Sequence, residues 1–247
     1  MLVFVAVLFG LVVGSFLNVV IHRVPRHESV VWPASHCPHC KEPIRPGDNV
    51  PLISYLLLRG RCRNCKEPIS ARYPAVEALT GLLFGAAAYE FGVSLALLPA
   101  LVLIPALIAL AVIDLEHRLL PNVIVGPAAL AGLALSILAN PAGWWTYPLS
   151  ALAVAGALLG LALVYPSGMG MGDVKMGGML GAFLGPYAAL AVFLGALLGA
   201  VTGGLLMAVG KVQRRSALPF GLFMAVGGVI SLFAGPQLWS LYMNLMM

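Results

Sequence analysis

The sequence predicts an all-α membrane protein that crosses the bilayer several times and carries one small polar insert. Hydrophobic residues make up 61% of its 247 residues, charged residues make up 9%, and the mean hydropathy is +0.98. A soluble protein cannot bury that much apolar surface in a core of its own. Runs of roughly the 17–25 apolar residues that a membrane-spanning helix requires recur along most of the chain. Only residues 22–73 have a soluble composition.

About eight segments are predicted to span the membrane. The first, residues 2–20, lacks the basic start and small-residue cleavage site of a signal peptide, so we interpret it as a retained span. The sixth, residues 176–186, is short unless it extends back into the glycine-rich stretch before it. The other predicted spans are 75–92, 94–113, 123–139, 148–165, 188–209 and 219–236. The chain therefore divides into a first transmembrane helix over 1–21, an insert over 22–73 and a membrane core over 74–247.

The distribution of basic residues predicts the orientation. Nine of the fourteen Lys and Arg lie in the insert, and the loops with Arg118, Lys175 and Lys211–Arg215 fall on the same side. The loops on the other side hold neither residue type, and these loops are 90–94, 140–147 and 184–187. Because basic loops stay in the cytoplasm, the N-terminus is expected outside and the insert inside. The positive net charge thus reflects topology and contact with anionic membrane lipid, and it does not indicate nucleic acid.

The insert contains all four cysteines, in a phrase that occurs twice. "CPHCKEPI" covers 37–44 and "CRNCKEPI" covers 62–69, with 21 residues between the two C-x-x-C pairs. Two such pairs at this separation can place four thiolates around one tetrahedral Zn²⁺. An insert of about 50 residues has too small a core to fold alone, and a structural metal ion would stabilise it. The predicted ligands are Cys37, Cys40, Cys62 and Cys65.

The alternatives for these cysteines are two disulfides, thiols without a function, or a ligand set in which a histidine replaces a cysteine. Disulfides are disfavoured because the predicted orientation places the insert in the reducing cytoplasm. His36 and His39 flank the first pair and could replace a cysteine as ligand, although the duplicated pairs make four cysteines the simpler set. The pattern implies no open coordination position, so it does not suggest a catalytic metal.

A second unusual stretch, "PSGMGMGDVKMGG" at 166–178, places Asp173 and Lys175 among glycines between two apolar runs. A charged side chain at membrane depth costs on the order of 2.5–3.5 kcal/mol on insertion scales, so it normally has a partner or a function. Unusual torsions and close approach of another chain are allowed by the glycines at positions 168, 170, 172, 177 and 178. Asp173 is therefore expected at the watery cytoplasmic mouth of a span, beside a segment that admits an extended substrate.

A second acid is predicted at the same level. Asp114 lies at the cytoplasmic end of the third span, in "ALAVIDLEHRLLPN". Two aspartates held together share one proton, so that one acts as a base on water while the other protonates a leaving amide. The alternatives are structural: Asp173 could be a helix N-cap, Asp114 could pair with Arg118 one helical turn away, and Lys175 and Arg118 could be basic anchors.

Six motifs in order resemble those of the type IV prepilin peptidases, which are membrane aspartic proteases of bacteria. "GMGMGDVKM" is similar to the family's G-x-G-D motif with its lysine, and "IDLEHRLLPN" to the motif of its first catalytic aspartate. The other four are "GSFLNVVIHRVP" at 14–25, the two C-x-x-C pairs, "SARYPAVEALTG" at 70–81 and "LPFGLFMAVGG" at 218–228. A lone G-x-G-D motif would carry little weight, whereas six ordered motifs are specific.

The resemblance implies a peptidase core over 74–247, with Asp114 and Asp173 as the catalytic pair. A supporting loop is implied for Gly170, Gly172 and Lys175. The implied activity is cleavage of the leader of prepilins and pseudopilins, for type IV pili or type II secretion, on the cytoplasmic face of the bacterial inner membrane. Members that keep the cysteines also methylate the new N-terminus with S-adenosylmethionine, so a bifunctional enzyme is expected.

The chain departs from the family pattern at Asn122, where many members have an acid, and this puts only a supporting role in doubt. The methyl-donor site has no visible motif, because no G-x-G-x-x-G turn follows a strand. Asn18, Arg23, Arg72 and Glu77 lie near the insert and are candidates for holding cofactor or substrate. Equally, a proline at the first helical position, Pro74, with Glu77 in the first turn is a good helix start.

Two other classes of function fit parts of the pattern. A transporter could use Asp114 and Asp173 as a proton or cation relay in broken helices, but it predicts inverted repeats, and the only repeat found is the C-x-x-C-K-E-P-I phrase. An assembly scaffold could use the insert to bind partner proteins, and it predicts that either aspartate is dispensable. Neither explains the whole set of motifs, and no feature of the sequence indicates an oligomeric state.

Overall fold

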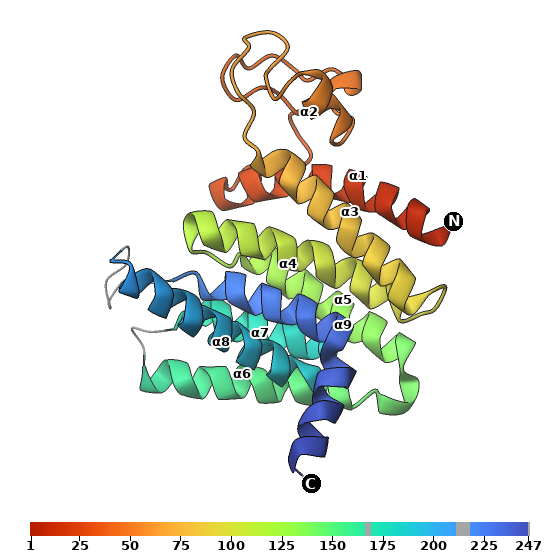
Figure 1. The fold of residues 1–247 in the computed structure, drawn as a ribbon, viewed down its shortest axis with the longest axis vertical. Coiled ribbons are helices and arrows are strands. Elements are labelled where there is room, and N and C mark those ends of the chain that lie inside the picture. Colours follow the sequence, from red (N-terminus) through yellow and green to blue (C-terminus); the bar gives the residue numbers. More distant parts are fainter. Residues whose placement is uncertain (166–168, 211–217, 247) are drawn as a thin grey trace. The chain divides into compact units, whose positions relative to one another are not determined.

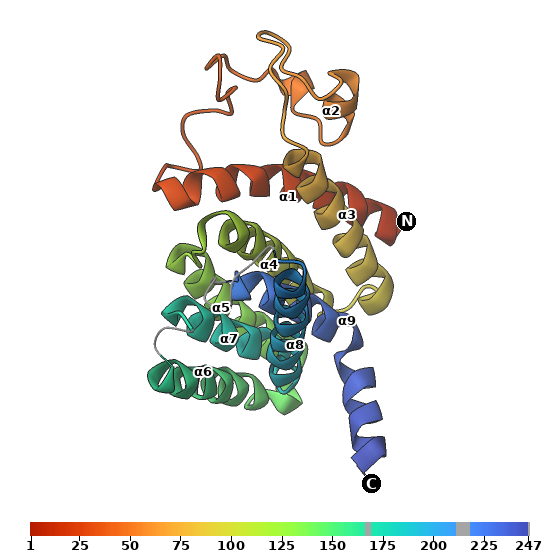
Figure 2. The same ribbon diagram turned by 60° about the vertical axis from the view of Figure 1, so that its left-hand side comes forward.

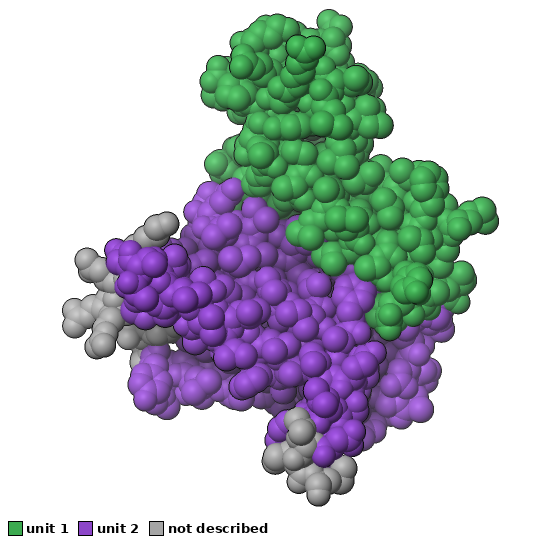
Figure 3. Space-filling view, in the orientation of Figure 1, with its two compact units in different colours: residues 1–93 green, residues 94–247 purple. Residues whose placement is uncertain are grey.

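The structure is a computed structural model, and it describes residues 1–165, 169–210 and 218–246. Within these ranges the chain consists of helices and loops, without an extended strand. It folds as two compact units, residues 1–93 (unit 1) and 94–247 (unit 2), which Figure 3 distinguishes by colour. The all-α prediction is therefore confirmed for the described residues.

Unit 1 consists of two long helices joined by the polar insert, which leaves the first helix and returns to the second as a loop-rich lobe (Figures 1 and 2). The first helix ends before Pro25, whose ring is incompatible with a helix interior. The helices are α1 (Leu2–Arg23), α2 (Ile53–Leu57) and α3 (Arg72–Phe91), with the 3₁₀ turns η1 (Val24–Arg26) and η2 (Pro46–Asp48).

Glycines bring the backbones of α1 and α3 close together. A Cβ at Gly10 would lie 2.8 Å from the Cα of Gly81, and a Cβ at Gly14 would lie 2.7 Å from the Cα of Glu77. Small residues at a helix crossing allow this approach, and the resulting van der Waals packing supports helix association in lipid. Unit 1 therefore includes the first predicted span, the insert and the second predicted span, because the two helices pack on each other.

Unit 2 is a helix bundle with α7 near its middle (Figures 1 and 2). Nine of the 14 residues of α7 are buried, and the helix contacts α5, α6, α8 and α9. The helices are α4 (Leu97–His117), α5 (Asn122–Ala139), α6 (Thr146–Val164), α7 (Met171–Leu184), α8 (Tyr187–Ala208) and α9 (Phe220–Met246), with the 3₁₀ turn η3 (Pro141–Gly143).

One apolar cluster holds α4, α7 and α9 together. Its fully buried members include Leu107 and Leu110 of α4, Met176 and Leu180 of α7, and Met224 of α9. This cluster fixes three helix ends at the same end of the bundle: the end of α4, the start of α7 and the start of α9. The predicted acids lie on two of these three ends.

Among the described residues, six helices are long and apolar enough to cross a membrane, namely α1, α4, α5, α6, α8 and α9. Two further helices are not among these six. α3 includes the charged residues Arg72, Glu77 and Glu90, and α7 has only 14 residues. With α3 and α7 included, the described long helices number eight, in rough agreement with the prediction of about eight. The sixth predicted span does extend back toward the glycines, because α7 begins at Met171. The chain is thus a multi-pass membrane protein.

Candidate functional site

Asp114 and Asp173 lie at the same end of unit 2. Asp114 is in the last turn of α4 and is 6% exposed, whereas Asp173 is in the first turn of α7 and is half-buried. The two carboxyl groups are close enough to interact electrostatically. Leu120 lies against this site, since its side chain would contact a Cβ at Gly172 and a Cβ at Gly221. The structure therefore brings the two predicted acids into one site.

The start of α9 holds Asp114. Oδ2 of Asp114 accepts a hydrogen bond of 3.1 Å from the N–H of Leu222, and the N–H of Gly221 also bonds to this carboxyl group. The N-terminal N–H groups of a helix lack intrahelical partners and favour negative charge. A Cβ at Gly221 would lie 2.9 Å from Oδ2 of Asp114, so a residue without a side chain is required there.

This role of the start of α9 was not predicted. The motif "LPFGLFMAVGG" was interpreted only as the last span, although a glycine just after a helix start is a sign of close approach by another group. The predicted alternative for Asp114, pairing with Arg118, is present as an electrostatic interaction between the two side chains and as a main-chain hydrogen bond. The N–H of Arg118 donates to the carbonyl of Asp114 at 2.8 Å, where α4 ends with Arg118 in the left-handed region at φ 53°.

Asp173 is bonded to the residue that starts its own helix. Its Oδ2 accepts from the N–H of Gly170 at 3.1 Å, and its own N–H donates to the carbonyl of Gly170 at 3.1 Å. The N-cap is therefore Gly170, and the alternative prediction that Asp173 is the N-cap is wrong by three positions. This reciprocal pair is typical of a capping box and fixes the direction of the Asp173 side chain.

The glycines around Asp173 allow close packing and do not adopt unusual torsions. Gly168 lies outside the described residues, and none of the other four has a positive φ. A Cβ at Gly172 would lie 3.0 Å from the Cβ of Leu120, and a Cβ at Gly177 would overlap Leu158. The prediction of unusual torsions is therefore wrong for Gly170, Gly172, Gly177 and Gly178, whereas that of close approach is confirmed for Gly172 and Gly177.

Lys175 and Asn122 join the starts of α7 and α5. Nζ of Lys175 donates a hydrogen bond of 2.9 Å to Oδ1 of Asn122, and both side chains are exposed. An amide oxygen accepts this bond as a carboxylate would, although without the charge. Asn122, the one departure from the family pattern, therefore forms a hydrogen bond with Lys175 that the sequence did not predict.

The four cysteines of the insert converge on one point. Their Sγ atoms all lie within 4.8 Å of one another, and those of Cys37 and Cys65 are 3.8 Å apart. Four sulfurs at about 2.3 Å from a tetrahedral Zn²⁺ would be separated by about 3.8 Å. The set therefore fits a zinc ion, and the histidine alternative is not needed. The Nδ1 atom of His36 lies 3.1 Å from the carbonyl of Ala34.

The repeated phrase forms two equivalent turns, which we call the knuckles (37–44 and 62–69). In the first, the N–H of Lys41 donates to the carbonyl of Cys37 at 2.9 Å, and in the second, Lys66 donates to Cys62 at 3.1 Å. Both lysines have a φ of 61°. In the second knuckle, the N–H groups of Cys65 and Asn64 lower the pKa of the Cys62 thiol to about 7, whereas desolvation and the neighbouring thiols raise the pKa of Cys65 to about 11.

An ion pair connects the second knuckle to η2. Nη2 and Nε of Arg63 donate to the two carboxylate oxygens of Asp48 at 2.6 and 2.7 Å. The hydrogen bonds from Arg63 hold the pKa of Asp48 below its usual range. A two-pronged pair fixes geometry better than a single contact. It therefore helps to hold the long loop between the knuckles in place.

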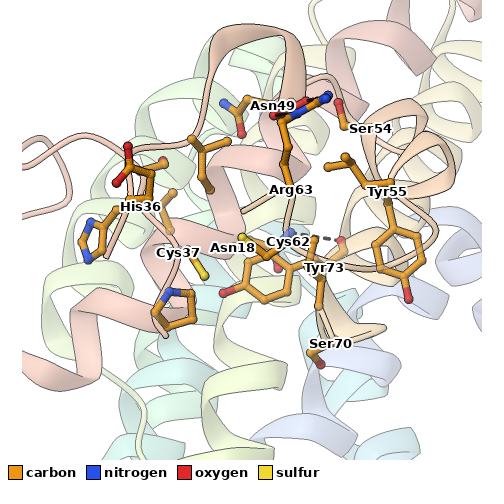
Figure 4. A pocket seen from close by; sticks show the side chains of 18 of the residues that line it. Asn18, His36, Cys37, Asn49, Ser54, Tyr55, Cys62, Arg63, Ser70 and Tyr73 are labelled. Atoms are coloured by element: carbon orange, nitrogen blue, oxygen red, sulfur yellow. Dashed lines mark hydrogen bonds and ion pairs between the residues drawn. The ribbon is translucent and has the colours of Figure 1, made fainter. Parts of the chain in front are cut away.

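The four candidates for cofactor binding line one cavity of about 850 Å³ in unit 1 (Figure 4). Two of them also hold the surrounding loops. Nη1 of Arg23 donates to the carbonyl of Ser29 at 2.9 Å, and Oε2 of Glu77 accepts from the N–H of Leu52 at 2.8 Å. Pro74 was predicted at the first position of this helix, but α3 begins two residues earlier, at Arg72, so Pro74 is its third residue. The structure thus brings together Asn18, Arg23, Arg72 and Glu77.

The fold and these sites define a class: a multi-pass helical membrane protein with two acids at one end of a bundle and a four-cysteine cluster that fits a metal ion in a polar insert. Two family models match the chain. The first, the bacterial peptidase A24 N-terminal domain, matches residues 8–91, and the second, the type IV leader peptidase family, matches residues 101–205. The second range contains both Asp114 and Asp173.

Relatives named prepilin leader peptidase/N-methyltransferase match most of the chain. One from Burkholderia pseudomallei is 36% identical, over 96% of this chain and 86% of the relative. One from Bacillus subtilis is 35% identical, over 96% of both chains, and one from Myxococcus xanthus is 46% identical, over 84% of this chain and 64% of the relative. No solved structure matches. The chain belongs to the prepilin leader peptidase/N-methyltransferase family.

Proposed function

We propose that this protein cleaves the leader peptide of type IV prepilins or pseudopilins with Asp114 and Asp173 and methylates the new N-terminal residue. The observation that supports the peptidase step is the placement of these two acids in one site, within the range that matches the leader peptidase family. The names of the relatives support both activities. Family membership gives no support to the alternative of a transporter.

The chemistry follows from two carboxyl groups that share a proton. One aspartate, ionised, takes a proton from a water molecule as that water attacks the scissile carbonyl. The other, protonated, polarises the carbonyl and then donates its proton to the leaving amide. The pair is expected to titrate as a unit. The N–H groups of Gly170, Gly221 and Leu222 hold the carboxyls, so little reorganisation is required during the reaction.

The substrate has to unwind locally before it can react, because the amide of a helical residue is hydrogen-bonded within the helix. Gly170 and Gly172 precede Asp173 and have no side chains to block an extended segment. Lys175 holds the start of α7 against Asn122 and so supports this loop.

The cellular placement is the bacterial inner membrane, with the N-terminus outside and the aspartates on the cytoplasmic side. The nine basic residues of the insert support this orientation. Zn²⁺ at Cys37, Cys40, Cys62 and Cys65 would hold the insert together. S-adenosylmethionine would supply a methyl group activated by its positively charged sulfur.

The test is leader cleavage by purified protein in detergent, together with transfer of a labelled methyl group to pre-cleaved pilin. Asp114→Asn and Asp173→Asn keep the shape of the side chain and remove the acid. Each is expected to lower the cleavage rate by at least about 10³-fold, since the acid–base steps contribute about 10²–10⁴-fold and both members act together. Methyl transfer should continue in both variants.

The matched control is Glu90→Gln, which neutralises an exposed acid at the end of α3 and should leave both rates unchanged. Each variant is compared with wild type by its unfolding temperature. If a folded Asp114→Asn or Asp173→Asn protein cleaves at the wild-type rate, the acid pair is not the catalytic group.

A further inference from the structure

The short helix of the insert, α2, carries an apolar face that the described residues leave uncovered. Ile53, Leu56 and Leu57 are 56%, 73% and 78% exposed, and their i, i+3, i+4 spacing places them on one side of the helix. A single exposed apolar residue is ordinary on a protein surface, whereas three on one short helix mark a site of contact. We call these three residues the α2 face, and a segment of soluble composition such as the insert has no need of it in water.

Hydrogen bonds fix the orientation of α2. Oγ of the buried Ser54 donates to the carbonyl of Gly47 and accepts from the N–H of Val50, both at 3.0 Å. At the helix start, the N–H of Leu52 donates to Oε2 of Glu77 in α3 at 2.8 Å. Because Glu77 is buried, a rotation of α2 that hid its apolar face would leave this carboxylate without its partner. The α2 face is therefore held outward.

The bond to Glu77 also sets the level of α2 along α1. A Cβ at Gly14 of α1 would lie 2.7 Å from the Cα of Glu77, so the start of α2 lies near the level of Gly14. Gly14 precedes Arg23, the last residue of α1, by nine positions, which is about 14 Å along the helix. Figures 1 and 2 both show α2 alongside α1 and not past its C-terminal end. Since α1 belongs to a span of Leu2–Arg26, α2 starts beside membrane-spanning sequence.

Basic residues follow the α2 face directly. Arg59 and Arg61 are exposed and come two and four positions after Leu57. Over 22–73 the chain has nine Lys and Arg against four Asp and Glu. Long basic side chains at a membrane boundary place their apolar stems along lipid and their charge among headgroups, where anionic lipid attracts them. The charge next to α2 is thus complementary to a bilayer surface.

Lipid fits the α2 face better than a protein partner does. A specific protein interface buries about 800 Å² on each partner, which a helix of five residues cannot provide. Acyl chains adapt to an apolar helix face at the membrane boundary, so no complementary surface is needed there.

We infer that α2 is a membrane anchor of the insert: the α2 face inserts among the acyl chains of the leaflet next to the C-terminal end of α1, and Arg59 and Arg61 lie at its anionic headgroups. Glu77 positions this anchor by holding the N–H of Leu52. The insert therefore rests against the bilayer at α2 and does not move freely in water. This inference goes beyond the proposed function, since neither leader cleavage nor methyl transfer by itself requires such an anchor.

The test is photo-crosslinking of the zinc-loaded full-length protein in vesicles of phosphatidylethanolamine and phosphatidylglycerol in equal amounts. Irradiation of Leu57→p-benzoylphenylalanine should join the protein to phospholipid, which mass spectrometry of the intact protein detects. The matched control is Glu42→p-benzoylphenylalanine, at an exposed residue of the first knuckle. Its lipid adducts should be at least about tenfold fewer, because only the α2 face reaches the acyl chains. Phosphatidylglycerol should exceed its share of the adducts, and Arg59→Gln together with Arg61→Gln should remove this excess.

Zinc content shows whether each variant keeps a folded insert, and the same replacement at Leu56 repeats the test at a second position of the α2 face. The inference is overturned if neither position yields a lipid adduct, or if the control yields as many. It is also overturned if the α2 face is joined instead to a second copy of the chain, or to a prepilin added to the vesicles. A lipid adduct at Leu57 in a preparation that cleaves no prepilin would support the anchor and contradict only the peptidase proposal.

Discussion

At the scale of single residues, Gly221 offers the sharpest test of the acid site. Gly221→Ala would place a Cβ 2.9 Å from Oδ2 of Asp114 and 2.8 Å from Cδ2 of Leu120. Relief of this overlap requires about 1–3 kcal/mol of distortion, and it moves the N–H groups that hold Asp114. We expect kcat/KM for leader cleavage to fall by about tenfold or more, measured with purified protein and a prepilin substrate.

The control for this change is Gly156→Ala, because a Cβ at Gly156 in α6 would have no atom within 4 Å. An alanine in a helix interior is favoured over glycine by about 0.5–1 kcal/mol, so this variant should be as stable as wild type or more stable. Wild-type cleavage by Gly221→Ala would mean that the contact between α9 and Asp114 does not matter for the reaction.

The bond between Lys175 and Asn122 gives a second prediction at this scale. Asn122→Asp replaces an amide acceptor with a carboxylate, which Lys175 can bond equally well. We expect its cleavage rate to stay within about threefold of wild type, since an exposed pair contributes only about 0–1 kcal/mol. Asn122→Leu removes the acceptor and should be slower than Asn122→Asp. A rate for Asn122→Leu equal to that of Asn122→Asp would exclude a role for this bond in the supporting loop.

Residue type and spacing were sufficient to predict that the four cysteines would converge and that the two aspartates would lie at the same end of the bundle. Cysteines in two C-x-x-C pairs can be recognised without knowledge of the fold, and so can an aspartate among glycines in an apolar chain. The partner of Asp114 could not be found in this way. Leu222 is 108 positions away and contributes only its main-chain N–H, which every residue except proline has.

At the scale of secondary-structure elements, the knuckles depend on a left-handed residue that the repeated phrase does not reveal. Lys66 has a φ of 61°, a conformation that β-branched side chains strongly disfavour. Lys66→Val is therefore expected to destabilise the second knuckle by about 1–2 kcal/mol and to speed zinc release to a chromophoric chelator. Lys66→Gly is the control and should release zinc no faster than wild type. Equal release rates for the two variants would contradict this account of the turn.

Apolar runs predicted the bounds of α5, α6 and α8 to within two residues, whereas α9 continues to Met246, ten residues past the predicted end at 236. They predicted the ends of α3 and α7 less well, because these helices begin in polar or glycine-rich sequence. α3 starts at Arg72, three residues before the predicted span, and α7 starts at Met171, five residues before it. In both, hydrogen bonds and close packing of the first turn decide the boundary, and hydropathy does not report either of them.

At the scale of the whole molecule, composition predicted a membrane core over 74–247 that the insert separates from the first helix. The compact units of the structure follow contacts between helices instead. α3 packs on α1 through Gly10, Gly14, Gly81 and Gly85, so residues up to 93 belong with the first helix. Glycines in an apolar run predict close approach, but the sequence alone does not say which helix is the partner.

The division into units predicts that zinc removal will separate the two activities. All four cysteines lie in unit 1, and both aspartates lie in unit 2. A chelator should unfold the knuckles, because the metal supplies much of the folding energy of such a small insert. We expect methyl transfer to pre-cleaved pilin to fall at least tenfold, while leader cleavage stays within about threefold of its initial rate.

Addition of Zn²⁺ should restore methyl transfer, and limited proteolysis within 37–69 should follow the same course as the loss of zinc. Asp173→Asn is the reciprocal control, since it should lose cleavage and keep methyl transfer. If cleavage falls in parallel with zinc content, the acid pair depends on the insert, and the two sites do not work independently. If methyl transfer survives complete zinc loss, the folded knuckles are not required for that activity.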